Sequence, residues 1–199
     1  MTALFESPAQ SLGDHIDRLA TIEATAETVR AWQPMLIPGL LQTYAYAVAA
    51  IQAHAPALPL ETVAIRARRR GERLAGIAHP QLRDAEFIVD EAALRRPVAG
   101  RQALTDQLGH LLAVDALQPR VRLRILPSTT DVHPGLAGAF TLYRAEDRHA
   151  VFTETLTGSH IATRPEDVAA YASAWERLER LALSPAASRA LIDSYRESR

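Results

Sequence analysis

The sequence predicts a single α+β domain in which helices pack on a small, mostly antiparallel sheet. Three observations support this prediction: an amphipathic helical pattern over residues 60–74, strict alternation over residues 120–126, and a helical apolar stripe that begins at Pro165. The predicted order is helices, a strand, helices, several strands and terminal helices, which is typical of the α+β class. With 199 residues, the chain is long enough to bury one substantial core.

The expected domain arrangement is simple. Residues 1–13 form a short N-terminal arm, and residues 14–199 form one ligand- or partner-binding domain, whose first helix begins near residues 11–14. No apolar run approaches the ~20 residues that a membrane helix needs. The N-terminus also lacks the basic and apolar regions of a secretory signal. We therefore expect a cytoplasmic protein. The sequence is also compatible with a homo-oligomer.

A rigid turn follows the first extended segment. Residues 28–37 are predicted to be extended. Pro38 and Gly39 are predicted to form a turn, because proline fixes φ near −65° and a Pro-Gly pair is typical of turns. A helix is predicted over residues 41–54. Residues 55–59 are a linker of a few residues.

Patterns in the rest of the chain define its remaining elements. The amphipathic helix 60–74 places Leu60, Val63 and Ala67 on one apolar stripe, and arginines lie about 120° away. Two helices are predicted at residues 91–95 and 100–117, and strands at residues 83–90, 120–126, 139–144 and 150–155. Residues 158–160 are expected to form a loop. Helices follow from Pro165 and from Ser184-Pro185, the latter a short C-terminal helix with proline at its start.

Composition excludes several classes of chemistry. The net charge is −1, all 22 basic residues are arginine, and the chain has neither lysine nor asparagine, which indicates a GC-rich genome. Schiff-base lysine chemistry and a lysine of a phosphate-binding loop are therefore excluded. The absence of cysteine excludes disulfides and thiolate catalysis. No close histidine pair or glycine-rich nucleotide loop occurs, so we expect neither a metal site nor a cofactor.

Arginines on the amphipathic helix form the most strongly charged motif. Arg66, Arg69 and Arg70, followed by Arg73, lie on one stripe and have the forked geometry that binds carboxylates or phosphates. This stripe is a candidate site for a small anionic ligand or an acidic protein partner. Alternatively, it is a solvated face, or it pairs with glutamates of the chain. Direct DNA binding is not expected, because four arginines in a nearly neutral protein make a small footprint.

Four side chains are candidates for acid–base chemistry. Glu91 ends a strand and opens a helix, where it either stabilises the helix N-terminus or acts as a buried general base. His133 lies in one long predicted loop and His160 in another. Either histidine could carry a proton together with Glu154, which lies near the end of a predicted strand. No Gly-x-Ser-x-Gly elbow occurs, so a hydrolase serine is unsupported.

Apolar and amide side chains around the turn are candidates for a pocket wall. Leu40, Gln42 and Tyr44 follow Pro38-Gly39 directly, and Trp32 and Tyr143 offer large aromatic surfaces. A corner of the core would use the same residues. We expect the site to lie between this turn, the arginine helix and the loop that holds His133.

Short motifs occur in a fixed order over residues 14–195. They are Ile37-Pro-Gly-Leu-Leu-Gln-Thr43 with Tyr46-Ala47, then residues 66–70, 89–98, 107–108, 125–127, 133–135, 138–140, 152–154, and 183–185 with Ser188. In this set the chain resembles the C-terminal domain of actinobacterial WhiJ-type regulators, which are antitoxin-like. Those regulators carry an Xre-type helix-turn-helix ahead of this domain. Only about a dozen residues precede the matched segment here, so we expect a stand-alone copy without the helix-turn-helix.

Two functions follow from this resemblance and from the residues. The first is a cofactor-free domain that binds a small molecule or a small acidic partner protein, as a sensor domain of a regulator would. The second is a cofactor-independent enzyme of secondary metabolism, such as a cyclase, isomerase or hydrolase. That enzyme would use Glu91, His133 or Glu154 for proton transfer in the same pocket.

Overall fold

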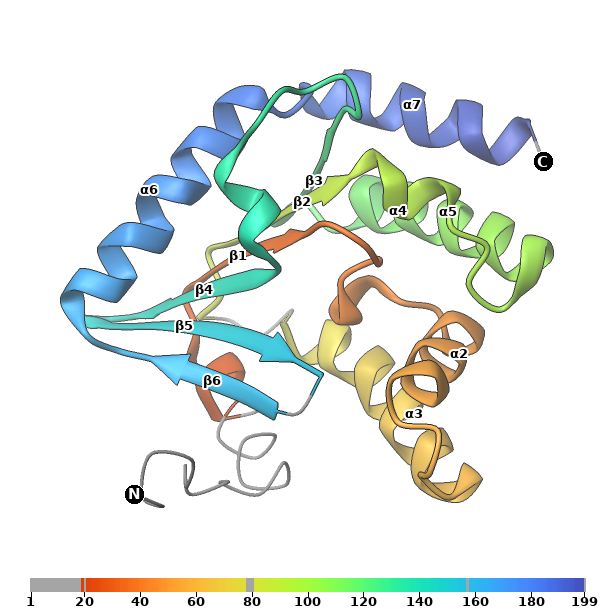
Figure 1. Cartoon of the computed structure of the whole chain (residues 1–199), viewed down its shortest axis with the longest axis horizontal. Helices are drawn as coiled ribbons and strands as arrows, with labels where there is room; N and C mark the ends of the chain where they lie inside the picture. Colours follow the sequence, from red (N-terminus) through yellow and green to blue (C-terminus); the bar gives the residue numbers. More distant parts are fainter. Residues whose placement is uncertain (1–18, 20, 78–80, 157, 199) are drawn as a thin grey trace, which may run out of the picture.

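The computed structural model describes residues 19, 21–77, 81–156 and 158–198. In this part of the chain, six strands form one sheet in the order β3-β2-β1-β4-β5-β6, with helices on both of its faces (Figure 1). The strands are β1 (Thr28–Gln33), β2 (Asp84–Asp90), β3 (Val121–Leu126), β4 (Phe140–Ala145), β5 (Arg148–Thr155) and β6 (Gly158–Ala162). The α+β class is therefore confirmed. The predicted arm and the predicted helix start at residues 11–14 lie outside the described residues.

Local signals explain where the helices begin. The helices are α2 (Tyr44–His54), α3 (Leu60–Ile77), α4 (Glu91–Arg95), α5 (Gly100–Leu117), α6 (Pro165–Leu181) and α7 (Pro185–Glu197), with the 3-10 turns η1 (Gly39–Leu41) and η2 (Pro134–Ala137). Thr43, Asp90 and Ser184 each accept a hydrogen bond from a main-chain N–H of the helix that follows. Pro165 and Pro185 occupy first helical positions, where a missing N–H costs nothing.

The sheet is mixed because its two halves are connected differently. β1, β2 and β3 pair in parallel, and each connection between them runs through helices, as parallel pairing requires. β4 pairs antiparallel with β1, and the β4–β5 and β5–β6 pairs are hairpins. Three of the five pairings are thus antiparallel.

Strand alternation divides the core into two layers. One face of the sheet carries Val29, Phe87 and Ile125, which join the core formed with α5 and α7. The opposite face carries Trp32 and Ile88, which join a second cluster with Trp175 and Leu178 of α6. Figure 1 shows α6 alone along one side, and α4, α5 and α7 together on the other. Helices α2 and α3 pack on each other through a third, smaller cluster, Ala47, Ile51, Val63 and Ala67.

Three local predictions are wrong. Residues 158–160 are not a loop but begin β6, because their main chain pairs with residues 153–155 of β5. The helix predicted from residue 41 begins only at Tyr44, since η1 and the Thr43 cap occupy the preceding residues. Leu60 was predicted on the apolar stripe of α3 with Val63, but it is 72% exposed, because it is the first residue of the helix.

Candidate functional site

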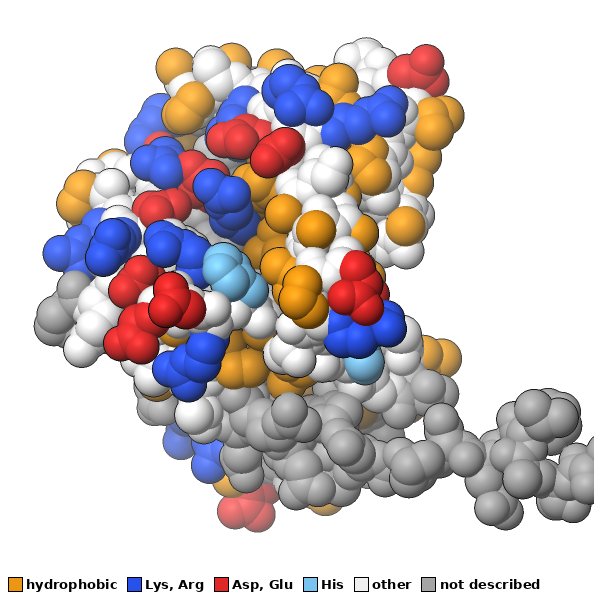
Figure 2. Space-filling view, turned by 90° about the vertical axis from the view of Figure 1, so that its left-hand side faces the viewer, with side chains coloured by type: hydrophobic (Ala, Val, Ile, Leu, Met, Phe, Trp, Pro, Cys, Tyr) orange, Lys and Arg blue, Asp and Glu red, His pale blue; other side chains and the backbone are white. Residues whose placement is uncertain are grey.

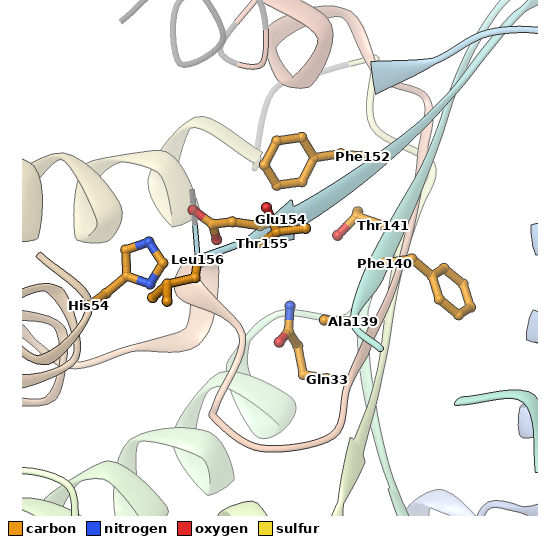
Figure 3. Close-up of a pocket in the computed structure, with 9 residues that line it drawn as sticks. All are labelled: Gln33, His54, Ala139, Phe140, Thr141, Phe152, Glu154, Thr155 and Leu156. Atoms are coloured by element: carbon orange, nitrogen blue, oxygen red, sulfur yellow. The ribbon is translucent and has the colours of Figure 1, made fainter. Parts of the chain in front are cut away.

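A cleft of about 300 Å³ opens on the sheet face opposite α6, between β1, β4, β5 and the C-terminal end of α2 (Figure 3). This volume is at the lower end of the range of small-molecule sites. The side chains that give the cleft its chemistry are Gln33, His54, Thr141, Phe152, Glu154 and Leu156. Of the residues predicted for a site, only Glu154 lines this cleft.

Strand register places the cleft residues on one face. Thr141 of β4 lies opposite Phe152 of β5, and alternation puts Glu154 on the same face as Phe152. Gln33 follows the buried Trp32 and therefore points to the opposite side of β1. Figure 3 shows the Gln33 and Thr141 side chains directed into the cleft, and the ring of Phe140 turned away from it.

Four polar side chains of the cleft have no side-chain partner among the described residues. Within the part of the chain that the structure describes, Gln33, His54, Thr141 and Glu154 make no side-chain hydrogen bond or ion pair. Thr155 differs, because its hydroxyl donates to the main-chain carbonyl of Gly158 at 3.0 Å within the β5–β6 turn. The cleft thus presents an amide, a hydroxyl, an imidazole and a carboxylate beside an aromatic ring.

The predicted turn residues are mostly engaged in holding the turn. Gln42 donates from Nε2 to the carbonyl of Ile37 at 2.7 Å and accepts from Arg70 Nη1 at 2.6 Å. The buried amide of Gln107 accepts from Thr43 N and donates to the Leu41 carbonyl, both at 2.7 Å. These bonds satisfy main-chain groups that the turn leaves without helix partners.

The remaining turn residues and the arginine stripe have different surroundings. Leu40 is buried in the core, whereas Tyr44 is 50% exposed at the start of α2. Arg69 is exposed and Arg66 is partly exposed, and neither forms an ion pair with a described residue. Arg70 instead packs against the turn beside Gly39 and Gln42.

Glu91 is held by a dense set of hydrogen bonds. Its Oε2 accepts from Ser128 N at 2.7 Å and from Ser128 Oγ at 2.9 Å. Its Oε1 accepts from Tyr195 Oη at 2.5 Å and from the guanidinium of Arg95. The carboxylate therefore joins α4, the segment after β3 and α7.

These contacts determine the acidity of Glu91. Burial raises the pKa of this carboxyl, but the hydrogen bonds from Ser128, Tyr195 and Arg95 outweigh burial and lower the pKa from 4.5 to about 2. A carboxylate with so low a pKa is a weak base. The geometry thus favours the structural alternative for Glu91, the anchoring of three segments.

Trp32 and His133 lie on the α6 face of the sheet, across from the cleft. Trp32 is fully buried and donates from Nε1 to the Gly135 carbonyl at 2.9 Å. Its ring meets the ring of His133 edge-on, with centroids 5.6 Å apart. The structure therefore does not bring His133 together with the arginine stripe or with Glu154.

Tyr143 is a core residue on the cleft face of the sheet. It is 5% exposed, and its hydroxyl donates to Glu23 Oε1 at 2.9 Å. The buried Glu23 precedes β1, so this bond ties the segment before the sheet to β4. Tyr143 thus has an internal partner, unlike the polar groups of the cleft.

Charges of both signs mix on the side of the molecule that carries α6. Figure 2 shows blue and red side chains next to one another there, without a continuous surface of one sign. Arg164 pairs with Asp167 at 2.7 Å, and Arg144 pairs with Glu27 at 3.4 Å. No group of three or more potential metal ligands occurs among the described residues. Within the same residues, no helix is long and apolar enough to span a bilayer.

Comparison with protein families gives one match. The sequence model of DUF5753, a domain of unknown function, matches residues 16–194. The chain belongs to the DUF5753 family. The matched segment includes all six strands and every cleft residue. Comparison with curated proteins found no match.

Sequence reasoning missed three polar residues of the cleft in this DUF5753 domain. Thr141 carries a signal, because it is a polar residue at an inward position of an alternating strand, two residues before Tyr143. Gln33 has a weaker signal, since it only ends a strand. His54 has no local signal, because its place beside β5 depends on how α2 and α3 fold back toward the sheet.

Proposed function

We propose that this DUF5753 domain is a ligand-binding domain that takes a small molecule into the cleft between β1, β4, β5 and α2. The observation that carries the proposal is the convergence on one cleft of about 300 Å³ of four polar side chains that have no partner among the described residues, Gln33, His54, Thr141 and Glu154. Few precisely placed polar groups beside apolar surface are typical of ligand sites.

A contrast within the molecule supports the proposal. Three buried polar side chains outside the cleft, Gln107, Glu91 and Tyr143, have internal hydrogen-bond partners, as is usual for buried polar groups. In the described part of the chain the cleft groups lack such partners, although Thr141 is buried and Gln33 is partly buried. His54 and Glu154 are exposed. All four therefore depend on water or a ligand for side-chain hydrogen bonds. A ligand that satisfies them replaces water without breaking a bond of the fold.

The role that fits such binding is the sensing of a small molecule. This role is expected from the resemblance of the chain to the C-terminal domain of WhiJ-type regulators. Ligand binding would then stabilise the folded state in proportion to ligand concentration. Closer ordering of α2 against β5 is the change that a ligand touching both His54 and Glu154 would favour.

A thermal-shift screen of a fragment library tests the proposal. Leu156 is 80% exposed, so Leu156→Trp fills the mouth of the cleft without disturbing the core. Leu117→Trp is the matched control, because Leu117 is 74% exposed at the end of α5. Fragments that stabilise the wild type and the control, but not Leu156→Trp, support the proposal. No stabilising fragment, or equal stabilisation of Leu156→Trp, contradicts it.

A second candidate function is the binding of a small acidic protein along α3. It is supported by Arg66 and Arg69, which have no ion-pair partner among the described residues and lie one turn apart. A pull-down from cells that express the genes beside this one tests it. Capture of an acidic protein that is lost in the Arg66→Ala/Arg69→Ala variant supports this function, and capture that persists contradicts it.

A cofactor-independent enzyme is the remaining alternative. It is favoured by the presence of two acid–base side chains, Glu154 and His54, in the same cleft. Glu91 and His133 are weaker candidates for this role, because Glu91 is fully hydrogen-bonded and His133 is buried on the other face. Turnover of an intermediate by the wild type, lost in both Glu154→Gln and His54→Gln, supports catalysis. Unchanged rates in both variants exclude these roles.

A further inference from the structure

We infer that the cleft selects an organic cation, a small molecule with an ammonium or similar group on an apolar body. The inference rests on the proposed ligand-binding function and adds the charge of the ligand to it. The decisive group is the carboxylate of Glu154, which lines the cleft and has no ion-pair partner among the described residues. A cation provides that carboxylate with a charged hydrogen bond.

Among the described lining residues, His54 is the one side chain beside Glu154 that can carry a positive charge. No arginine lines the cleft among the described residues, and the sequence contains no lysine. Described carboxylates that are largely buried, such as Glu91, Glu86 and Glu27, have a nearby guanidinium. Glu154 differs from them, because it is exposed at the cleft and has no ion-pair partner among the described residues.

The other walls of the cleft add to the preference for a cation. The ring of Phe152 lies beside Glu154 (Figure 3), and an aromatic face attracts a cation within about 6 Å of its centre. The cleft also lies at the C-terminal end of α2, where free carbonyl groups carry partial negative charge. An anion would meet the Glu154 carboxylate, the ring face and this helix end, with His54 as the one described lining residue that can carry a positive charge.

The polar groups on the strands suggest how the ligand is oriented. The Thr141 hydroxyl and the Gln33 amide line the inner side of the cleft, and Glu154 and His54 line the side near α2 (Figure 3). A cationic head near Glu154 leaves the body of the ligand against Phe152 and Thr141. Hydroxyl or carbonyl groups on that body would then meet Gln33 and Thr141.

Three probes of similar shape and different charge test the inference: phenethylamine, 2-phenylethanol and 3-phenylpropionate. Their affinities for the full chain are measured by calorimetry at low salt, for the wild type, Glu154→Gln and Glu176→Gln. Glu176 is an exposed residue of α6 and serves as the charge-matched control. We expect phenethylamine to bind the wild type and the control about fivefold more tightly than 2-phenylethanol, and this preference to disappear in Glu154→Gln.

The outcomes separate this inference from the proposed function. Equal or tighter binding of 3-phenylpropionate or 2-phenylethanol overturns the preference for cations and leaves a ligand-binding cleft. A preference for phenethylamine that survives in Glu154→Gln also overturns the inference, because the charge then acts elsewhere. Failure of all three probes to bind overturns both the inference and the function on which it rests.

Discussion

Two groups of polar residues in this domain have contrasting environments. Gln107 and Glu91 are buried with complete sets of hydrogen bonds, so their removal leaves partner groups unsatisfied. Thr141 and Glu154 face the cleft without described partners, so their removal leaves the fold intact. Substitutions of the first kind are expected to change stability, and substitutions of the second kind are expected to change binding.

Glu91→Gln is predicted to destabilise the protein by roughly 3 kcal/mol near neutral pH, because the pKa of Glu91 is lowered from 4.5 to about 2 in the folded state. A lowered folded-state pKa stabilises the protein above the unfolded pKa, and this stabilisation is lost as pH falls through the folded pKa. The difference between variant and wild type is therefore expected to shrink from about pH 5 downward and to vanish near pH 2. Urea unfolding at several pH values measures this difference in the free energy of unfolding.

Glu176→Gln is the control for this experiment. Glu176 is exposed and has no ion-pair partner among the described residues, so its substitution is expected to change stability by less than about 0.5 kcal/mol at every pH. A pH-independent loss of stability in Glu91→Gln would mean that the carboxylate charge plays no part in anchoring α4 to α7.

Gly135→Ala is predicted to destabilise the protein by about 1–3 kcal/mol, because a Cβ at this position would lie 2.6 Å from the ring of Trp32. The fully buried indole has no room to retreat. Gly71→Ala in α3 is the control, since nothing lies within 4 Å of its Cβ and alanine favours the helix by up to about 1 kcal/mol. Thermal unfolding of both variants checks the prediction, which fails if Gly135→Ala is as stable as the wild type.

Elements with a clear period were predictable from the sequence, and those defined by partners were not. Helix α5 has the predicted bounds because its inward leucines recur at helical spacing, and β3 follows from strict alternation. Strand β6 was not predicted, because its segment is short and begins with polar residues and so shows no clear alternation. Its pairing with β5 makes it a strand. The start of α2 was misplaced because the Thr43 cap overrides the helical pattern of Leu40 and Leu41.

Gln107→Ala tests how α5 holds the turn before α2. Gln107 is fully buried, and its amide bridges Thr43 N and the Leu41 carbonyl at 2.7 Å each. The variant leaves both main-chain groups unsatisfied, so we expect a loss of about 2–3 kcal/mol. Chemical denaturation measures this loss. Gln102→Ala, an exposed position on the same helix, is expected to stay within about 0.5 kcal/mol, and equal effects of the two variants would contradict the role of the bridge.

For the whole molecule, the class could be predicted from the sequence, but the location of the site could not. The predicted site combined the turn, the arginine helix and His133, yet the sheet separates His133 from the other two. Strand order decides this separation, because the chain crosses from β3 at one edge to β4 beside β1. Glu154 was found because it is an acidic residue near a strand end. Its neighbours Gln33 and His54 come from distant segments that only the assembled fold brings together.

Ligand binding in the cleft is tested most directly by amide NMR on the isotope-labelled full chain, titrated with phenethylamine and with 3-phenylpropionate. Binding in the cleft is expected to concentrate shift changes at Gln33, His54 and Thr141 and in the segment 152–156, which includes Phe152, Glu154, Thr155 and Leu156 of the cleft wall. These changes are expected to be lost in Leu156→Trp. Changes centred on η2 or α3, or no saturable change with either probe, would contradict the claim that this cleft is the binding site.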